Sequence, residues 1–80
     1  MNMSTTRPMT EGEYRVGTSF NPSGDEAVAA IKSAVASVID AMHEIASNRD
    51  HPGARCASIA MTELESAAMW AVKAITKQPR

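Results

Sequence analysis

The residues best suited to chemistry in this chain lie in one short N-terminal segment and at one lysine further along. They are Tyr14, Arg15, Gly17, Thr18 and Lys32. An aromatic ring can stack on a nucleobase, while cations and backbone N–H groups can meet a phosphodiester. Together these residues suit a purine that carries a phosphate. We therefore predict a ligand-binding site at this segment.

A plainer interpretation of the same region stays open. Val16 and Phe20 can instead staple the start of the next helix. Lys32 lies about 40° from Val28 on a helical wheel, at the border of an apolar face. Its stem would then lie on apolar surface while its ammonium reaches into solvent. Residue types and spacing do not decide between the two interpretations.

No catalytic residues, metal site or cofactor are predicted. His43, His51 and Cys56 are the soft metal ligands of the chain, and they flank a turn without a recognised ligand spacing. A catalytic role for Cys56 would need a histidine partner and an oxyanion site that nothing specifies. Glu63 and Glu65 fall on different faces of a helix, so they form no carboxylate pair. We predict that the protein is not an enzyme.

Length and charge limit the protein class further. The chain has 80 residues and a net charge of −1, which allows one domain. Basic and acidic residues balance, which disfavours binding to duplex nucleic acid. No apolar run reaches transmembrane length, and the N-terminus lacks the apolar core of an export signal. We expect a small cytoplasmic protein with no membrane partner.

A first helix, expected over about residues 23–47, must carry the lysine. Ser23 and Glu26 fit a capping box, and Asn21 before Pro22 gives an alternative cap, so the helix should begin within residues 22–24. Apolar residues then recur at the spacing of a packed seam. They are Val28, Ile31, Val35, Val38, Met42 and Ile45.

A second helix, expected over about residues 52–78, follows a short turn that makes the two helices antiparallel neighbours. One of its faces carries Met61, Leu64, Ala68, Val72 and Ile75. Ile59 and Trp70 fall on nearly the opposite face. A helix with two apolar faces needs two partners, and one chain supplies only one. We predict that Ile59 and Trp70 form an oligomer interface.

The predicted fold class is therefore all-α. It is an antiparallel two-helix hairpin with an N-terminal loop, and it assembles into a helical homo-oligomer. Residues 1–13 are interpreted as a flexible arm and residues 14–80 as the hairpin domain. Residues 11–20 are expected to form a short extended segment or loop.

Three stretches resemble a known family. They are YRVGTSFNPSG, the Ile31–Lys32 pair, and IAMTELESAAMWAVKA. Together they resemble the phage-encoded cyclic-oligonucleotide sponges that blunt CBASS immunity, whose hairpin domain is shared with sponges that inhibit Thoeris immunity. The resemblance covers about residues 14–78. It implies a non-enzymatic helical hairpin that assembles as a hexamer, a trimer of dimers. It also implies sequestration of cyclic dinucleotides such as cyclic GMP–AMP between protomers, and of cyclic trinucleotides such as cyclic tri-adenylate at separate three-fold sites.

The resemblance also implies roles for individual residues. Tyr14 would lie over a base of the cyclic dinucleotide, and Lys32 would contact its phosphate. Arg55 and Thr62 are the candidates for the cyclic trinucleotide site. One stretch departs from the family pattern, because the FNPSG segment lengthens the loop between Tyr14 and Lys32. The shape of the pocket, and hence its ligand preference, therefore does not follow from the resemblance.

Two alternative functions stay open. The protein can be a sponge for the cyclic ADP-ribose signal of Thoeris immunity. It can also be a helical-hairpin scaffold or interaction protein with no small-molecule ligand. A scaffold predicts that Tyr14→Ala weakens assembly or partner binding and has no ligand affinity to lose.

Overall fold

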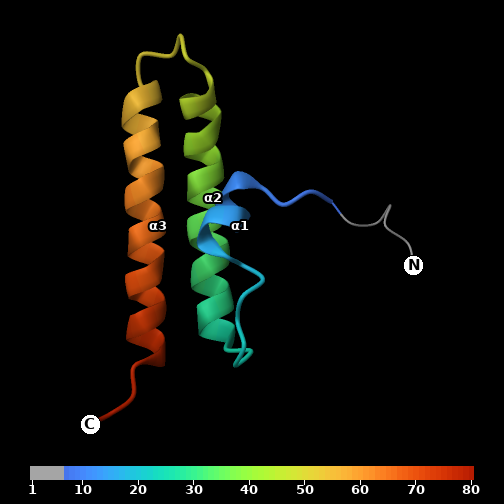
Figure 1. Ribbon diagram of the computed structural model, residues 1–80, viewed down its shortest axis with the longest axis vertical. Helices are drawn as coiled ribbons and strands as arrows, with labels where there is room; N and C mark the ends of the chain where they lie inside the picture. The colour runs from blue at the N-terminus through green and yellow to red at the C-terminus, as the bar shows by residue number, and fades with distance from the viewer. Residues whose placement is uncertain (1–6) are drawn as a thin grey trace.

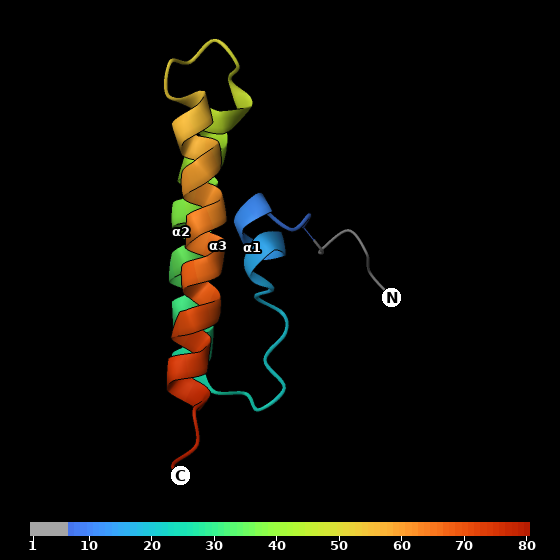
Figure 2. The same ribbon diagram turned by 60° about the vertical axis from the view of Figure 1, so that its left-hand side comes forward.

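The computed structural model describes residues 7–80, which form three helices: α1 (Glu11–Val16), α2 (Glu26–Ser47) and α3 (Ala54–Thr76). No strand occurs in these residues, and none of their helices is long and apolar enough to cross a membrane. α2 and α3 are antiparallel neighbours (Figure 1), and α1 lies beside them (Figure 2). The predicted all-α hairpin is therefore confirmed. Residues 1–6 of the predicted arm lie outside the described residues.

α2 begins later than the sequence analysis expected. Its first residue is Glu26, because the Asp25 side chain accepts hydrogen bonds from two N–H groups of the first turn, at 2.8 and 3.2 Å. Ser23 and Asn21 therefore do not cap the helix. Asn21 instead stabilises the preceding turn, where its side-chain amide exchanges hydrogen bonds with the backbone of Asp25. α3 (Ala54–Thr76) is also shorter than the expected range of about 52–78 at both ends.

The largest difference from the expected fold is α1, which replaces the expected loop over much of residues 11–20. Thr10 and Glu13 form a capping box, in which the Thr10 hydroxyl accepts from Glu13 N at 3.1 Å and the Glu13 carboxylate accepts from Thr10 N at 3.0 Å. Gly17 ends the helix at a φ of 73°, a conformation that glycine adopts without a steric penalty. A helix of six residues is not stable alone, so α1 depends on α2.

α1 docks on α2 through Gly12. The Gly12 N–H donates to Asp40 Oδ1 at 2.7 Å, and a Cβ built on Gly12 would lie 2.0 Å from the Ala36 carbonyl oxygen. Only a residue without a side chain allows this approach. Before α1, Arg7 donates to the Glu13 carboxylate, and this hydrogen bond, together with the one from Thr10 N, lowers the pKa of Glu13 to about 2. The Gly12 contacts hold α1 against α2, and the Arg7–Glu13 pair stabilises the start of α1.

Small and medium side chains fill the space between the helices. The buried apolar residues are Val28, Ala36, Ile39, Ala57, Met61 and Ala68. The buried stripe of α2 is displaced from the predicted seam, since Val38 is 48% exposed and Lys32 only 7%. The physical reason is α1, which covers the side of α2 that carries Ala36 and Asp40. The interpretation in which Lys32 reaches into solvent at the border of the seam is therefore wrong.

Candidate functional site

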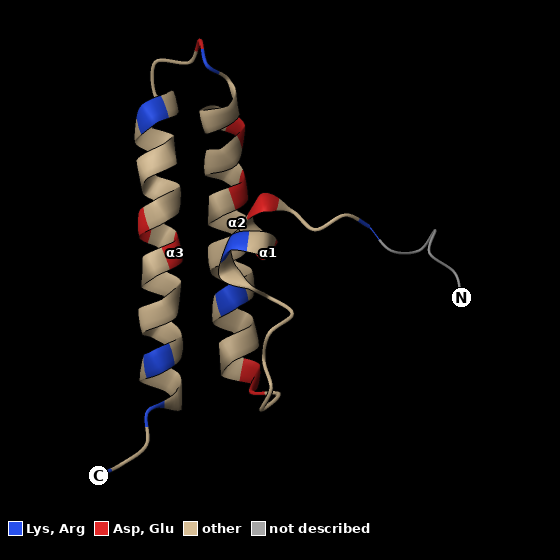
Figure 3. Cartoon of the chain, viewed as in Figure 1, with Lys and Arg blue, Asp and Glu red and all other residues tan. Residues whose placement is uncertain are grey.

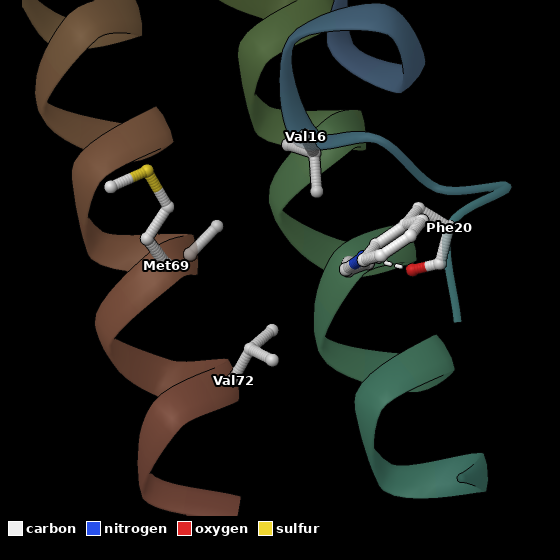
Figure 4. A pocket seen from close by; sticks show the side chains of 6 residues that line it. Val16, Phe20, Met69 and Val72 are labelled. Carbon is white, nitrogen blue, oxygen red and sulfur yellow. Dashed lines mark hydrogen bonds between the residues drawn. The ribbon is translucent and has the colours of Figure 1, made fainter. Parts of the chain in front are cut away.

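A cavity of about 280 Å³ lies between the three helices and the turn that follows α1. It is lined by Val16, Phe20, Lys32, Ala68, Met69 and Val72. In Figure 4, Val16 and Phe20 lie on one side of the open space, and Met69 and Val72 on α3 lie on the other. The side chains that line it are apolar except for that of Lys32. The cavity therefore combines apolar walls with one cation.

Lys32 is buried and holds the turn after α1. Its ammonium donates to the carbonyl oxygen of Gly17 at 3.0 Å and to that of Phe20 (Figure 4). Its Nζ also lies 5.4 Å from the centroid of the Phe20 ring, a cation–π distance. The lysine thus connects α2 to the turn that carries one wall of the cavity.

The charge of Lys32 is incompletely compensated. Among residues 7–80 no carboxylate forms an ion pair with it. An ammonium has three N–H donors, and protein acceptors in this part of the chain take two of them. A buried charge is costly unless it is paired and hydrogen-bonded. A ligand anion in the cavity would supply the missing partner.

Tyr14 and Arg15 lie outside this cavity. Tyr14 is 74% exposed and is not one of the lining residues. Arg15 Nε lies 2.8 Å from a Glu11 oxygen, and its Nη1 lies 3.6 Å from a Glu65 oxygen. These two carboxylates compensate the charge of Arg15, so it is a weaker candidate for an anion than Lys32. The structure of one chain does not bring Tyr14 and Lys32 together around one cavity.

Gly17 and Thr18 contribute differently from the expectation. Their N–H groups both donate to the Glu13 carbonyl, at 2.9 and 3.2 Å, and so complete the C-terminal cap of α1. These N–H groups are engaged within the chain and are not free to meet a phosphate. Gly17 still lies at the site, because its carbonyl accepts a hydrogen bond from Lys32.

The candidates for a second ligand site lie along α3. A hollow of about 380 Å³ beside the turn between α2 and α3 is lined by Ala46, Arg49, His51, Pro52, Ala54, Arg55 and Ser58. It includes Arg55 but not Thr62, whose hydroxyl donates to the Ser58 carbonyl at 3.4 Å. α2 carries one basic residue, Lys32, and α3 carries Arg55 and Lys73 far apart, so the basic residues form no continuous stripe on the face in Figure 3.

Ile59 and Trp70 are both exposed on α3, at 49% and 65%. Lys73 Nζ lies 5.3 Å from the centroid of the Trp70 ring. Exposed apolar residues of this size are available for contact with a second chain. Their role as an oligomer interface stays a prediction.

Sequence reasoning missed Phe20 as a site residue. Phe20 is 71% exposed, so it does not serve as the staple that the sequence analysis considered. Its position between Gly17 and Pro22, in a turn rather than a helix, was the available signal. The pattern Thr10-x-x-Glu13 was likewise an unused capping-box signal for α1.

No group of His, Cys, Asp and Glu residues that could hold a metal occurs in residues 7–80.

Comparison with protein-family models matches residues 12–76 to the Acb2/Tad1 hairpin domain. Searches of curated proteins and of solved structures gave no match. The matched range begins within α1 and ends at the last residue of α3, so it includes every element that lines the cavity. The family predicted from the sequence is therefore confirmed. The chain belongs to the Acb2/Tad1 hairpin-domain family.

Proposed function

We propose that this protein binds cyclic oligonucleotide second messengers and holds them intact, and that it thereby antagonises CBASS immunity in the cytoplasm of an infected bacterium. Membership of the Acb2/Tad1 hairpin family implies a cyclic-nucleotide sponge in anti-phage defence. The proposed ligands are cyclic dinucleotides such as cyclic GMP–AMP, with cyclic tri-adenylate at a separate site. No bond of the ligand is broken, and the protein acts by lowering the concentration of unbound second messenger.

The main observation in support of this proposal is the buried ammonium of Lys32. It lines the cavity, it has no carboxylate partner within residues 7–80, and two of its three donors are satisfied by carbonyls. A phosphodiester oxygen would accept the third N–H and compensate the charge. Charge-assisted hydrogen bonds are about twice as strong as neutral ones. The apolar walls would accept the flat surface of a base.

The small volume of the cavity supports the assembly of several copies of the chain. Its volume of about 280 Å³ lies at or below the lower end of the roughly 300–1,000 Å³ range of ligand pockets. One chain therefore encloses part of a cyclic dinucleotide, and a second copy must cover the rest. We propose a homohexamer, a trimer of dimers, with Ile59 and Trp70 in its interfaces. In that assembly Tyr14, exposed in one chain, would stack on a base.

A second site is proposed around Arg55 and Thr62 for cyclic tri-adenylate. The hollow beside the hairpin turn supports it, because Arg49, His51 and Arg55 place basic groups there. Three copies around a three-fold axis would each offer one such set to the three phosphates of the ring. Thr62 lies outside this hollow in one chain and would join the site only through assembly.

The family name also indicates a second class of ligand. The model that matches this chain covers both Acb2 and Tad1 proteins, and the latter inhibit Thoeris immunity. A cyclic ADP-ribose isomer also combines a purine with phosphate groups. It is therefore the alternative ligand for the same cavity.

Calorimetric titration of the purified protein with cyclic GMP–AMP tests the proposal, followed by cyclic tri-adenylate added to the saturated complex. Tight binding in both steps is expected for a sponge with two separate sites. Chromatography of the recovered ligand should show the intact ring, and a linear product would contradict sequestration. Binding of a cyclic ADP-ribose isomer alone would favour the Thoeris alternative. If the protein binds none of the three ligands, the scaffold function is favoured.

A further inference from the structure

We infer that Phe20 is the ring that covers a planar ligand group in this cavity, and that Lys32 sets the position of that ring. The inference rests on the proposed function, because it names the stacking residue of the same site. The phenyl ring of Phe20 belongs to the FNPSG segment, which the sequence analysis identified as a departure from the family pattern.

Phe20 is the one aromatic residue that lines the cavity. Its side chain is 71% exposed, which leaves a large apolar ring in contact with water in the free chain. Tyr14 is equally exposed but does not line the cavity. Within one chain, the residue able to stack on a ligand in this cavity is therefore Phe20.

The backbone of Phe20 is held although its ring is exposed. Its N–H donates to the Gly17 carbonyl at 3.0 Å, and its own carbonyl accepts from the Lys32 ammonium. The same ammonium donates to the Gly17 carbonyl at 3.0 Å. Both ends of this short turn are thus bound to one side chain of α2. A ring on a fixed backbone loses less freedom on binding than a ring on a mobile loop.

The opposite wall of the cavity suits the second face of a base. Met69 and Val72 on α3 lie across the open space from Phe20 (Figure 4). A methionine side chain is flexible and polarisable and makes favourable contacts with aromatic rings. A base between Phe20 and Met69 would place its attached phosphate within reach of Lys32. The cavity of one chain would then take one nucleotide unit of a cyclic ligand.

Titration of three Phe20 variants with cyclic GMP–AMP, beside the wild type, tests this inference. Phe20→Tyr keeps an aromatic face, Phe20→Leu keeps apolar volume without one, and Phe20→Ala removes both. We expect Kd to stay near the wild-type value in Phe20→Tyr. We expect it to rise in Phe20→Leu and Phe20→Ala by roughly 5- to 150-fold, the range that loss of one base–aromatic stack gives. Circular dichroism checks that each variant keeps its helices.

Amide exchange in the ligand-free protein tests whether Lys32 fixes the position of Phe20. In Lys32→Met the Phe20 amide should exchange faster than in the wild type, while the amides in the middle of α3 keep their protection. Unchanged exchange at Phe20 would overturn the positioning role. Wild-type affinity in both Phe20→Leu and Phe20→Ala would overturn the stacking role and leave the proposed function standing. A wild-type protein that binds no cyclic GMP–AMP would overturn both together.

Discussion

Replacement of Gly12 by alanine should release α1 from α2 without unfolding the hairpin. The added Cβ would lie 2.0 Å from the Ala36 carbonyl oxygen, and the nearest atoms are all backbone atoms of α2 that have no freedom to rotate away. Carbon and oxygen atoms of this kind do not approach within about 3 Å, so α1 must move outward by about 1 Å. The Gly12 N–H to Asp40 Oδ1 hydrogen bond, 2.7 Å long, would then be broken.

The expected cost follows from two opposing contributions. A hydrogen bond to a charged group contributes about 1.5–3 kcal/mol. Alanine recovers about 1 kcal/mol of this, because it is the better helix former. The net destabilisation of docked α1 is therefore about 0.5–2 kcal/mol, or roughly a 2- to 30-fold larger population of the undocked form. Any steric strain that the shift does not relieve adds to this value.

Hydrogen–deuterium exchange of the amides in α1 measures the effect directly. The protection of residues 13–18 should fall by the factor above in Gly12→Ala, while amides in the middle of α2 and α3 stay protected. Gly53→Ala is the matched control, since the nearest atoms to its Cβ belong to the His51 side chain at 3.3 Å, which can rotate. Wild-type protection of α1 in Gly12→Ala would refute the argument that a glycine is required at this contact.

Three further predictions concern the ligand, the assembly and pH. Lys32→Met should weaken cyclic GMP–AMP binding by at least about 10-fold through the lost charge-assisted hydrogen bond, measured by calorimetry, while Lys77→Met leaves it unchanged. Trp70→Ala should lower the mass of the assembly in light scattering, because a large exposed aromatic residue is the natural interface anchor. Hydrogen bonds from the Arg7 side chain and then from the Thr10 backbone lower the pKa of Glu13 from 4.5 to about 2. Its stabilisation of α1 should therefore be complete above pH 4.5 and lost as the pH falls toward 2, which amide exchange across that range measures.

Each of these predictions has a result that would contradict it. Tight binding by Lys32→Met would mean that the buried ammonium only holds the turn after α1. An unchanged mass for Trp70→Ala would place the interface elsewhere on α3. Exchange of α1 amides that does not respond between pH 4.5 and 2 in the wild type, or that responds equally in Arg7→Gln, would show that the Arg7–Glu13 pair does not stabilise α1.

The two long helices could be predicted because their signals are local. Helical periodicity places Met61 and Ala68 on one face of the second helix, and both are buried in the structure. The same wheel places Ile59 and Trp70 on the other face, where both are exposed. A short turn between two helices forces them to lie antiparallel, which needs no knowledge of the rest of the fold.

The ends of the elements were harder to predict, because several residues compete for each cap. Ser23, Asn21 and Asp25 all have side chains that can cap a helix, and Asp25 does so. α1 was missed although Thr10 and Glu13 carry its capping-box pattern. Six residues give too little periodicity to show a helix, and its stability comes from contact with α2 rather than from its own sequence.

The sequence by itself determined the helical hairpin and its family, and it named Lys32 and Arg15 as candidate cations. Only the tertiary structure decided that Lys32 is buried, that its ammonium binds the turn after α1, and that Phe20 rather than Tyr14 lines the cavity. The physical reason is that a helical wheel gives the direction of a side chain but not what covers it. Here the covering elements are α1 and the turn after it, and the close approach of Gly12 to Ala36 and Asp40 helps to dock α1 on α2.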